Sequence, residues 1–383
     1  MKNVKKFDII ICGGGGAGLL LAHGLVNDPH FNHFSIALIE KDNKDQNDRT
    51  WCFWEEGKGD WDHLVSAQWD NAVFTSSNHK VHFPLTPYKY KMIEGKHFYQ
   101  DLYPRLEKAN NISLFREEIT SLNPGKNETI VSTNKGEYRS KKVFSSLPQE
   151  NYKLQKKYPV LQQHFIGWFV TTEAPIFEPD SMVFMDFDLP QKGNTRFMYV
   201  LPFSSNKALV EYTLFSKDLL ENKEYEDEIT WYLLQKKAGK VTIDAKEQGS
   251  IPMTAYPFDQ HNRSSLMHIG TAGGWTKAST GFTFQKSNEK IKELIQYLKK
   301  ELPLNQFPQR NKFNFYDLLF LDVLAKHNGE GSQLFSRMFQ RNSPQRIFQF
   351  LDEKTSYAQE VRLMSSFPIG RFVRALFKRL FSL

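Results

Sequence analysis

Apolar and polar positions alternate in blocks near the start of the chain in a way that predicts a β–α–β unit. Residues 7–12 (FDIIIC) are almost all apolar and β-branched, which is typical of a buried strand. A run of glycines follows, and then the apolar segment 19–25, which predicts a helix. Residues 34–39 (FSIALI) predict a second buried strand. This order indicates a parallel sheet covered by helices.

The glycine run between the first strand and the helix fits the spacing G-x-G-x-x-G. In such a loop the first glycine permits a tight turn, the second lets the backbone approach a pyrophosphate, and the third lets the helix pack on the strand. The helix N-terminus then presents free N–H groups to the phosphates. The predicted nucleotide-binding residues here are Gly13, Gly14, Gly15, Gly16, Ala17 and Gly18.

Glu40 ends the second predicted strand, 22 residues after Gly18. An acid at this position accepts hydrogen bonds from the ribose hydroxyls of a dinucleotide. The alternative is a glutamate that only caps a strand beside a glycine turn. The complete β–α–β–Glu unit favours the nucleotide site.

A second strand-to-glycine segment begins at residue 266 and precedes a helix predicted over about 283–300. Flavoproteins of the glutathione-reductase type bind the ADP half of FAD with a unit at the N-terminus and cover the flavin half with a later glycine segment. The chain resembles them in this respect, which favours FAD over NAD as the cofactor. The candidate flavin-side residues are Gly270, Ala272, Gly273 and Gly274.

Composition narrows the class of protein. A chain of 383 residues is long enough for two to three folding units, and no apolar run approaches the length of a membrane span. Two cysteines and a start without a signal-peptide pattern lead us to expect a cytoplasmic protein without disulfides or a metal site. Much of the net charge of +7 comes from basic residues near the C-terminus, so the chain shows no extended basic stretch of the kind that a nucleic-acid partner requires. Aromatic residues reach 14%, which suits a large, flat, apolar ligand.

The middle of the chain predicts strands, among them 197–201 and 208–215, and the part after residue 301 predicts helices such as 315–325 and 345–351. We therefore expect an α/β protein. A discontinuous Rossmann-type FAD-binding domain comprises 1–60, 90–150 and 250–300. An inserted β-sheet substrate domain comprises 61–89 and 151–249, and a C-terminal helical region comprises 301–383.

Short motifs along nearly the whole chain resemble those of lycopene β-cyclases, the carotenoid-biosynthesis flavoproteins. In chain order these are 48–53 (DRTWCF), 163–168 (QHFIGW), 185–187 (MDF), 199–202 (YVLP), 209–213 (LVEYT), 270–282, 350–353 (FLDE) and 367–368 (FP). The combination is specific although each segment is short. One departure stands out: Tyr212 occupies the position where members commonly carry a second acid after the catalytic glutamate.

The resemblance implies a reaction in which the ends of linear lycopene, or a related carotene, close into β-ionone rings without net oxidation. It implies reduced FAD as the active cofactor form and NADPH as its reductant. Glu211 matches the catalytic acid, and Asp186 is the next candidate. Trp51, Phe53, Trp168 and Trp275 are candidate aromatic stabilisers of a cation. Arg49 either contacts FAD or pairs with Asp45 or Asp48.

From residues alone, a strand glutamate such as Glu211 points to solvent by alternation, and the resemblance reverses this preference. A carboxylic acid donates a proton near neutral pH only when burial raises its pKa, so we expect Glu211 to be buried among apolar groups.

The tail 367–383 has basic residues at 371, 374 and 378 and apolar residues at 372, 376, 380 and 383, a pattern that predicts a basic amphipathic helix. The helix either closes the last domain or lies on the inner face of an anionic membrane, and we favour peripheral attachment. Two other functions stay open: an FAD- and NADPH-dependent monooxygenase of a lipophilic substrate, and a lipid carrier without flavin.

Overall fold

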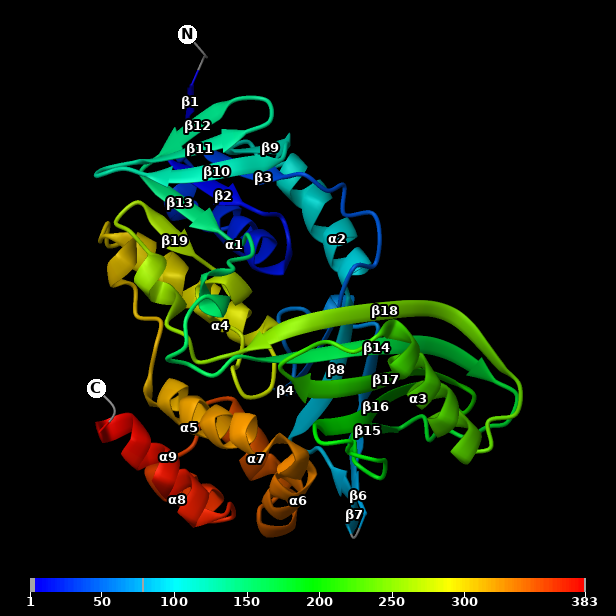
Figure 1. Ribbon diagram of the computed structural model, residues 1–383. Coiled ribbons are helices and arrows are strands. Elements are labelled where there is room, and N and C mark those ends of the chain that lie inside the picture. The colour runs from blue at the N-terminus through cyan, green and yellow to red at the C-terminus, as the bar shows by residue number, and fades with distance from the viewer. Residues whose placement is uncertain (1–3, 78, 382–383) are drawn as a thin grey trace.

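The computed structural model describes residues 4–77 and 79–381. Figure 1 shows three regions: a small α/β unit at the N-terminal end, a large sheet in the middle, and a group of helices that ends at the C-terminus. The chain passes back and forth between the first two regions, so neither is continuous in sequence.

The α/β unit is built on a five-stranded parallel sheet. Its strand order is β19 (Leu266–His268), β13 (Lys142–Ser145), β2 (Ile9–Cys12), β3 (Ile36–Glu40) and β9 (Ile112–Arg116). The helices α1 (Gly16–Val26), α2 (Gly95–Glu107) and α4 (Phe284–Leu298) pack on one face of this sheet.

A four-stranded sheet covers the opposite face of the parallel sheet. Its strands are β1 (Lys5–Lys6), β12 (Glu137–Ser140), β11 (Thr129–Thr133) and β10 (Ile119–Pro124). Successive residues of β2 point to opposite faces: Ile9 and Ile11 pack against the helices, and Ile10 and Cys12 against the four-stranded sheet. A strand covered on both faces is apolar throughout, which explains the continuous run in the sequence.

The central sheet has seven strands. Their order is β18 (Val241–Met253), β14 (Leu161–Thr172), β17 (Lys207–Ser216), β16 (Thr195–Ser204), β15 (Ser181–Asp186), β6 (Asn71–Ser76) and β7 (His79–Pro84). Helix α3 (Asn222–Gln235) covers one face. A separate three-stranded sheet of β4 (Thr50–Glu56), β8 (Tyr88–Glu94) and β5 (Ala67–Trp69) contributes side chains to the core of the central region and to that of the α/β unit.

The C-terminal region consists of α5 (Lys312–Lys326), α6 (Gly331–Arg341), α7 (Pro344–Leu351), α8 (Tyr357–Met364) and α9 (Ile369–Phe381). Its aromatic side chains pack on those of the central sheet: Phe339 stacks on Phe74 with ring centres 4.3 Å apart. Short 3-10 turns occupy Pro29–Phe31, Asp62–Leu64, Asn151–Lys153, Phe258–His261, Gly270–Gly273, Leu304–Gln306 and Asn328–Glu330.

The elements predicted from hydrophobic patterning are present, and most observed bounds differ from the predicted ones by one to four residues. Residues 88–94 and 50–56 pair with each other in the three-stranded sheet. The edge strand of the central sheet, β18, extends to residue 253.

The tail forms the predicted helix, and part of its apolar face is covered by another helix of the protein. Phe372 and Leu376 are half-buried, because α9 packs on α5 with this side. Arg379 forms a bidentate ion pair with Asp322, and both N···O distances are 2.6 Å. Arg371 forms an ion pair with Glu330 at 2.6 Å. The apolar side chains that α9 exposes are Ile369, Val373, Phe377, Leu380 and Phe381.

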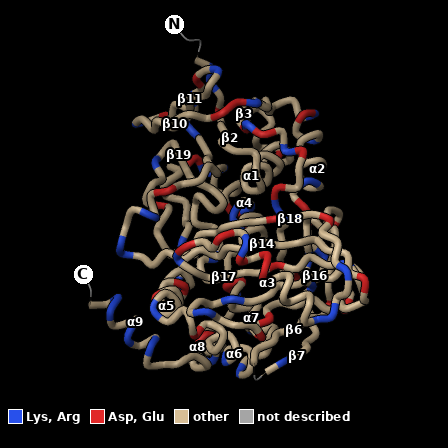
Figure 2. Tube along the Cα trace, turned by 45° about the vertical axis from the view of Figure 1, so that its right-hand side comes forward, with Lys and Arg blue, Asp and Glu red and all other residues tan. Residues whose placement is uncertain are grey.

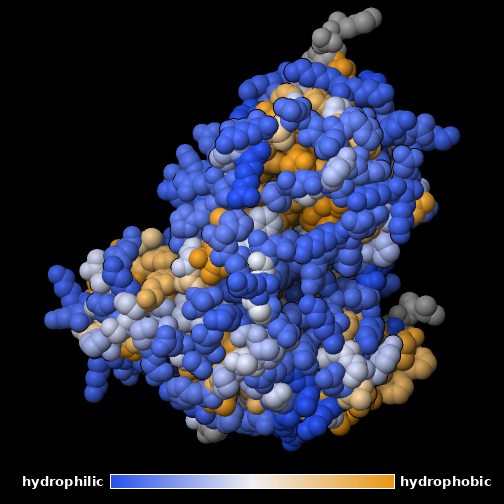
Figure 3. All heavy atoms as spheres, turned by 180° about the vertical axis from the view of Figure 1, so that it is seen from behind, coloured by the Kyte–Doolittle hydropathy of each residue, from blue (hydrophilic) through white to orange (hydrophobic). Residues whose placement is uncertain are grey.

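Residue 383 lies outside the described residues. Figure 2 shows basic residues along α9. Figure 3 shows an apolar patch at the same end of the molecule. Within residues 4–77 and 79–381, we find no helix with the length and apolar character that crossing a bilayer requires.

Candidate functional site

The first glycine loop joins β2 to α1 in a conformation that requires glycine. Gly13 has φ +98°, a left-handed value, and a side chain at Gly18 would collide with the carbonyl oxygen of Gly13. Gly15 caps α1, and nothing lies within 4 Å of where its Cβ would be. The loop therefore leaves open space in front of the helix N-terminus, where an anion is favoured.

Glu40 lies beside this loop at the end of β3. One carboxylate oxygen accepts a hydrogen bond of 2.6 Å from the backbone N–H of Gly14, and the other accepts one of 3.0 Å from that of Asp42. Two backbone donors thus fix the carboxylate next to the glycine loop, at the strand end where a ribose would lie.

The second glycine segment packs directly on the first. Gly270 has φ +61°, and a Cβ there would lie 2.7 Å from the Cβ of Ala17 in α1. Ala272 lines the same cavity as Ala17, whereas Gly273 and Gly274 do not line it. Gly274 has φ +75° and ends the 3-10 turn Gly270–Gly273. The two segments that the sequence predicts to share one ligand are therefore adjacent.

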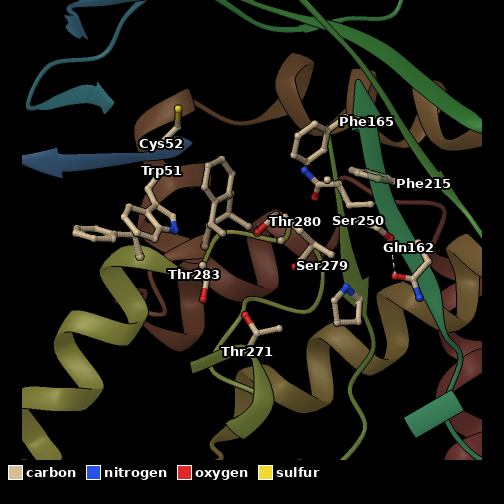
Figure 4. Close-up of a pocket in the computed structure, with 18 of the residues that line it drawn as sticks. Trp51, Cys52, Gln162, Phe165, Phe215, Ser250, Thr271, Ser279, Thr280 and Thr283 are labelled. Atoms are coloured by element: carbon tan, nitrogen blue, oxygen red, sulfur yellow. Dashed lines mark hydrogen bonds between the residues drawn. The ribbon is translucent and has the colours of Figure 1, made fainter. Parts of the chain in front are cut away.

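A large cavity begins at these two segments and continues between the central sheet and the C-terminal helices. Its volume is about 750 Å³. Figure 4 shows Trp51, Thr271 and Thr283 on one side of the cavity and Phe165 and Phe215, which belong to the central sheet, on the other. Beyond the sheet the lining is almost wholly aromatic and aliphatic, with contributions from Phe320, Phe335, Phe350, Phe367 and Phe372.

Several buried polar atoms along the cavity have no hydrogen-bond partner among the described residues. They include both amide atoms of Gln149, the amide oxygen of Gln163 and the hydroxyl of Thr280, all on residues that line the cavity. Buried polar groups of this kind are normally satisfied, so this part of the wall suits a ligand with its own donors and acceptors. Arg49 also lines the cavity, with an exposed side chain and no ion pair among the described residues.

Glu211 lies on β17 and faces the cavity. It is 7% exposed. Thr213, two residues along the same face, donates a hydrogen bond to it. Burial first, and the charge of Glu247 second, raise the pKa of Glu211 to about 8, against an opposing effect of the bond from Thr213. The carboxyl is therefore protonated at neutral pH and available as an acid.

Glu247 on β18 is a second acid of this cavity, and the sequence analysis did not single it out. It accepts a hydrogen bond of 2.6 Å from the hydroxyl of Thr50. Burial raises its pKa to about 7, the nearby charge of Glu94 acts in the same direction, and the bond from Thr50 opposes both. The polar segment around it (KEQGS) gave no signal, because only the pairing of β18 with β14 brings it to the cavity.

Asp186 lies elsewhere. It is at the end of β15, does not line the cavity, and accepts a hydrogen bond of 3.1 Å from the hydroxyl of Tyr232 in α3. Lys236 lies 3.7 Å from it. Tyr212 likewise points to the α3 side, where its hydroxyl accepts a bond of 3.1 Å from Arg196.

Of the four aromatic residues that the motifs suggested, Trp51 lines the cavity and the others do not. Phe53 stacks on Phe284 at 5.1 Å, and Trp275 is buried and bonds to Gln309. Trp168 packs on the α3 side of the sheet. The aromatic wall near Glu211 comes instead from Tyr90, Phe165, Phe184, Phe197, Tyr199 and Phe215.

No group of three or more His, Cys, Asp or Glu side chains with a metal-binding arrangement occurs within the described part of the chain. The two cysteines, Cys12 and Cys52, are not bonded to each other.

Solved structures share this fold over nearly the whole chain. A geranylgeranyl bacteriochlorophyll reductase-like protein from Thermoplasma acidophilum has a TM-score of 0.61 at 11% identity, covering 98% of this chain and 97% of that one. A flavoprotein/dehydrogenase from Cytophaga hutchinsonii has a TM-score of 0.57 at 12% identity, with coverage of 94% and 100%. A flavin-dependent brominase has a TM-score of 0.57 at 14% identity, with coverage of 94% of each chain. These likenesses confirm the predicted flavoprotein fold: a Rossmann-type domain, an inserted sheet and a C-terminal helical region.

No curated protein matches the sequence. The model of the family described as "Lycopene cyclase protein" matches residues 8–379. This is nearly the full length, and it includes both glycine segments, the central sheet and the C-terminal helices. The chain belongs to the lycopene cyclase protein family.

Proposed function

We propose that the protein is a lycopene β-cyclase that closes the ends of lycopene, or of a related linear carotene, into β-ionone rings. The observation that carries the proposal is Glu211, a buried carboxyl with a raised pKa in the wall of an apolar cavity that reaches both glycine segments. Membership of the lycopene cyclase family supports the substrate class.

Glu211 supplies the proton that begins the reaction. The proton adds to the terminal double bond of the polyene, the resulting cation closes the ring, and loss of a proton from the ring restores the double bond. No oxidation occurs, and the proton count is unchanged. Aromatic side chains around Glu211 keep water from the cation, and their π faces attract it.

FAD is the proposed resident cofactor, and the residues of the site fit it. The open space at Gly15 and the N-terminus of α1 suit a pyrophosphate, and Glu40 suits a ribose. The unpartnered polar atoms of Gln149 and Thr280 suit the polar edge of a flavin ring. Reduced FAD would supply an electron-rich ring beside the developing cation, and NADPH is the proposed source of its electrons. Arg49 stays a candidate contact.

The test is expression in bacteria that accumulate lycopene, followed by pigment analysis and by measurement of the flavin bound to the purified protein. Wild type forms rings, whereas Glu211→Gln keeps its flavin and forms none. Asp244→Asn is the matched control, because Asp244 is an exposed acid of β18 bonded to Thr171 and away from the cavity. Ring formation by Glu211→Gln would contradict the proposed role.

A flavin-dependent monooxygenase is the second candidate, favoured by a fold that the flavin-dependent brominase also has. The two reactions differ in consumption of oxygen. A monooxygenase uses NADPH and oxygen in proportion to product, whereas a cyclase turns over without oxygen once its flavin is reduced. Product formation in an oxygen-free vessel supports the cyclase, and its absence there supports the monooxygenase.

We also propose that α9 attaches the protein to the cytoplasmic face of an anionic membrane. Val373 and Phe377 are exposed, and Arg374 and Lys378 form no ion pair with the described residues. Exposed apolar side chains with adjacent cations suit such a surface. Phe372, on the same helix, lines the cavity, which supports a short path for an apolar substrate between a membrane and the cavity.

The test is sedimentation of the full chain with phosphatidylglycerol vesicles, with phosphatidylcholine vesicles for comparison. We expect the double change Val373→Asp and Phe377→Asp to weaken binding to the anionic vesicles while leaving flavin content unchanged. Unchanged sedimentation of the double variant would show that α9 does not attach the protein to the membrane.

A further inference from the structure

Two acids of the cavity, the buried Glu211 and the half-buried Glu247, lie on either side of one glycine. Strand β14 lies between β17 and β18, and Gly167 of β14 pairs with Glu211 on one side and with Glu247 on the other. Residues opposite one another in neighbouring strands point to the same face of a sheet. Glu211 and Glu247 therefore both face the cavity.

The glycine makes room for both side chains. A Cβ at Gly167 would lie 3.5 Å from the Cβ of Glu211 and 3.3 Å from the Cγ of Glu247. The two side chains thus converge over the position where any larger residue of β14 would stand. Two carboxyl groups so placed cannot both be ionised without strong repulsion.

Neither carboxyl forms an ion pair with a Lys, Arg or His among residues 4–77 and 79–381. Glu211 accepts a bond from Thr213, and Glu247 accepts one from Thr50, so each acid has one hydroxyl donor. The bond from Thr50, beside Trp51, fixes Glu247 at the side of the cavity nearer the glycine loops.

The other titratable groups facing the pair are Cys52 of β4, Tyr90 of β8, Tyr199 of β16 and Glu94 at the end of β8. Burial raises the pKa of Cys52, Tyr90 and Tyr199, so these three stay neutral at physiological pH. Glu94 acts on Glu247 and is not among the groups that shift Glu211. The charge that reaches Glu211 is therefore that of Glu247.

We propose that Glu247 is the positioning residue of the proton donor: the two acids share one proton, and the negative charge of Glu247 keeps that proton on Glu211. This inference rests on the proposed function. When Glu211 protonates the alkene, the pair carries two negative charges, which face the new cation. When the closed ring loses its proton, that proton returns to the pair, so each turnover restores the starting state. The second acid, absent at Tyr212, is thus supplied from another strand.

The test compares Glu247→Gln with wild type in the full-length protein. The amide keeps an oxygen for the bond from Thr50 but removes the charge, so we expect the pKa of Glu211 to fall. Ring formation by the purified, reduced enzyme should then be lost at lower pH than in wild type. Glu247→Asp keeps the charge and should keep a profile near that of wild type, and Asp244→Asn is the charge-matched control on the same strand.

A measurement without carotene tests the same point independently of activity. Protein labelled with ¹³C in the glutamate carboxyls is titrated by NMR, and the resonance missing from Glu211→Gln identifies Glu211. Glu247→Gln should move this titration to lower pH, and an unchanged midpoint would overturn the inference.

The two proposals fail separately. Absence of rings with the wild-type enzyme would contradict the cyclase, while the NMR titration would still decide whether the acids are coupled. Rings from wild type together with an unchanged midpoint in Glu247→Gln would overturn the inference alone.

Discussion

The two faces of the central sheet each bury an acid, and the acids have opposite surroundings. Asp186 at the α3 face is 4% exposed and has Tyr232 and Lys236 as partners, together with the backbone N–H of Asp188 at 3.0 Å. Glu211 at the cavity face is also buried, with 7% exposed, but its charged neighbour is another acid. Burial alone does not make a carboxyl a proton donor; the partners decide whether its buried form is charged or neutral.

Neutralising each acid in turn should give the largest difference between the two faces. Glu211→Gln should lower the rate of ring formation at least about 100-fold, since general acids contribute factors of this size or more. Asp186→Asn should keep ring formation and cost about 1 kcal/mol of unfolding free energy, the worth of a hydrogen bond. Pigment analysis and urea unfolding measure the two effects. The comparison is wrong if Asp186→Asn abolishes the rings while Glu211→Gln retains them.

The protonation of Glu211 predicts how activity depends on pH. Because the donor must carry its proton and its pKa is raised to about 8, ring formation should fall about tenfold for each pH unit above that value. The rate of the purified enzyme with saturating reductant, measured between pH 6 and about pH 10, checks this. Activity that rises steadily across the range would mean that the essential group acts as a base.

The free energy of unfolding should also depend on pH because of the raised pKa of Glu211. The pKa of Glu211 is about 8 in the folded protein and near the ordinary value of 4.5 in the unfolded chain, so the folded state holds a proton that the unfolded state loses between these values. The free energy of unfolding therefore falls as pH rises through this window, by up to a few kcal/mol. Urea unfolding of wild type and Glu211→Gln at pH 5 and about pH 8 measures the difference. The variant should lose less stability than wild type, and parallel losses would contradict a neutral buried acid.

The smallest effect concerns Thr213, whose hydrogen bond lowers the pKa of Glu211. Thr213→Val removes the donor, so the pKa of Glu211 should rise and the alkaline loss of activity should move to higher pH. This direction is opposite to the one expected for Glu247→Gln. A shift of both variants in the same direction would show that general disturbance of the sheet, and not charge, determines the profile.

The α/β unit could be predicted from the sequence because its information is local. The spacing of Gly13 and Gly18 reflects a turn and a close helix–strand contact within a few residues of one another. The apolar strand 7–12 reflects a sheet covered on both sides. Such features depend on steric limits of the backbone and on the period of side-chain direction, which a single sequence displays.

The cavity could be predicted only in part, because distant segments form it. Glu211 was found through a motif, whereas alternation alone would have turned it to solvent; both faces of β17 are in fact buried. Glu247 could not be found, since it reaches the site through the pairing of β18 with β14 across Gly167. Likewise the pattern of the tail did not reveal that α5 packs on the side of α9 that carries Phe372 and Leu376, which are therefore half-buried.

The most direct test of the account is ring formation in heavy water. Between turnovers, the carboxyl of Glu211 exchanges its proton with heavy water, including a proton returned from the preceding ring. Each ring formed by the wild-type enzyme should therefore contain one deuterium at the carbon that received the proton, as mass spectrometry of the product would show. Glu211→Gln should form no ring under the same conditions. Rings from wild type without deuterium, or deuterated rings from Glu211→Gln, would contradict Glu211 as the proton donor.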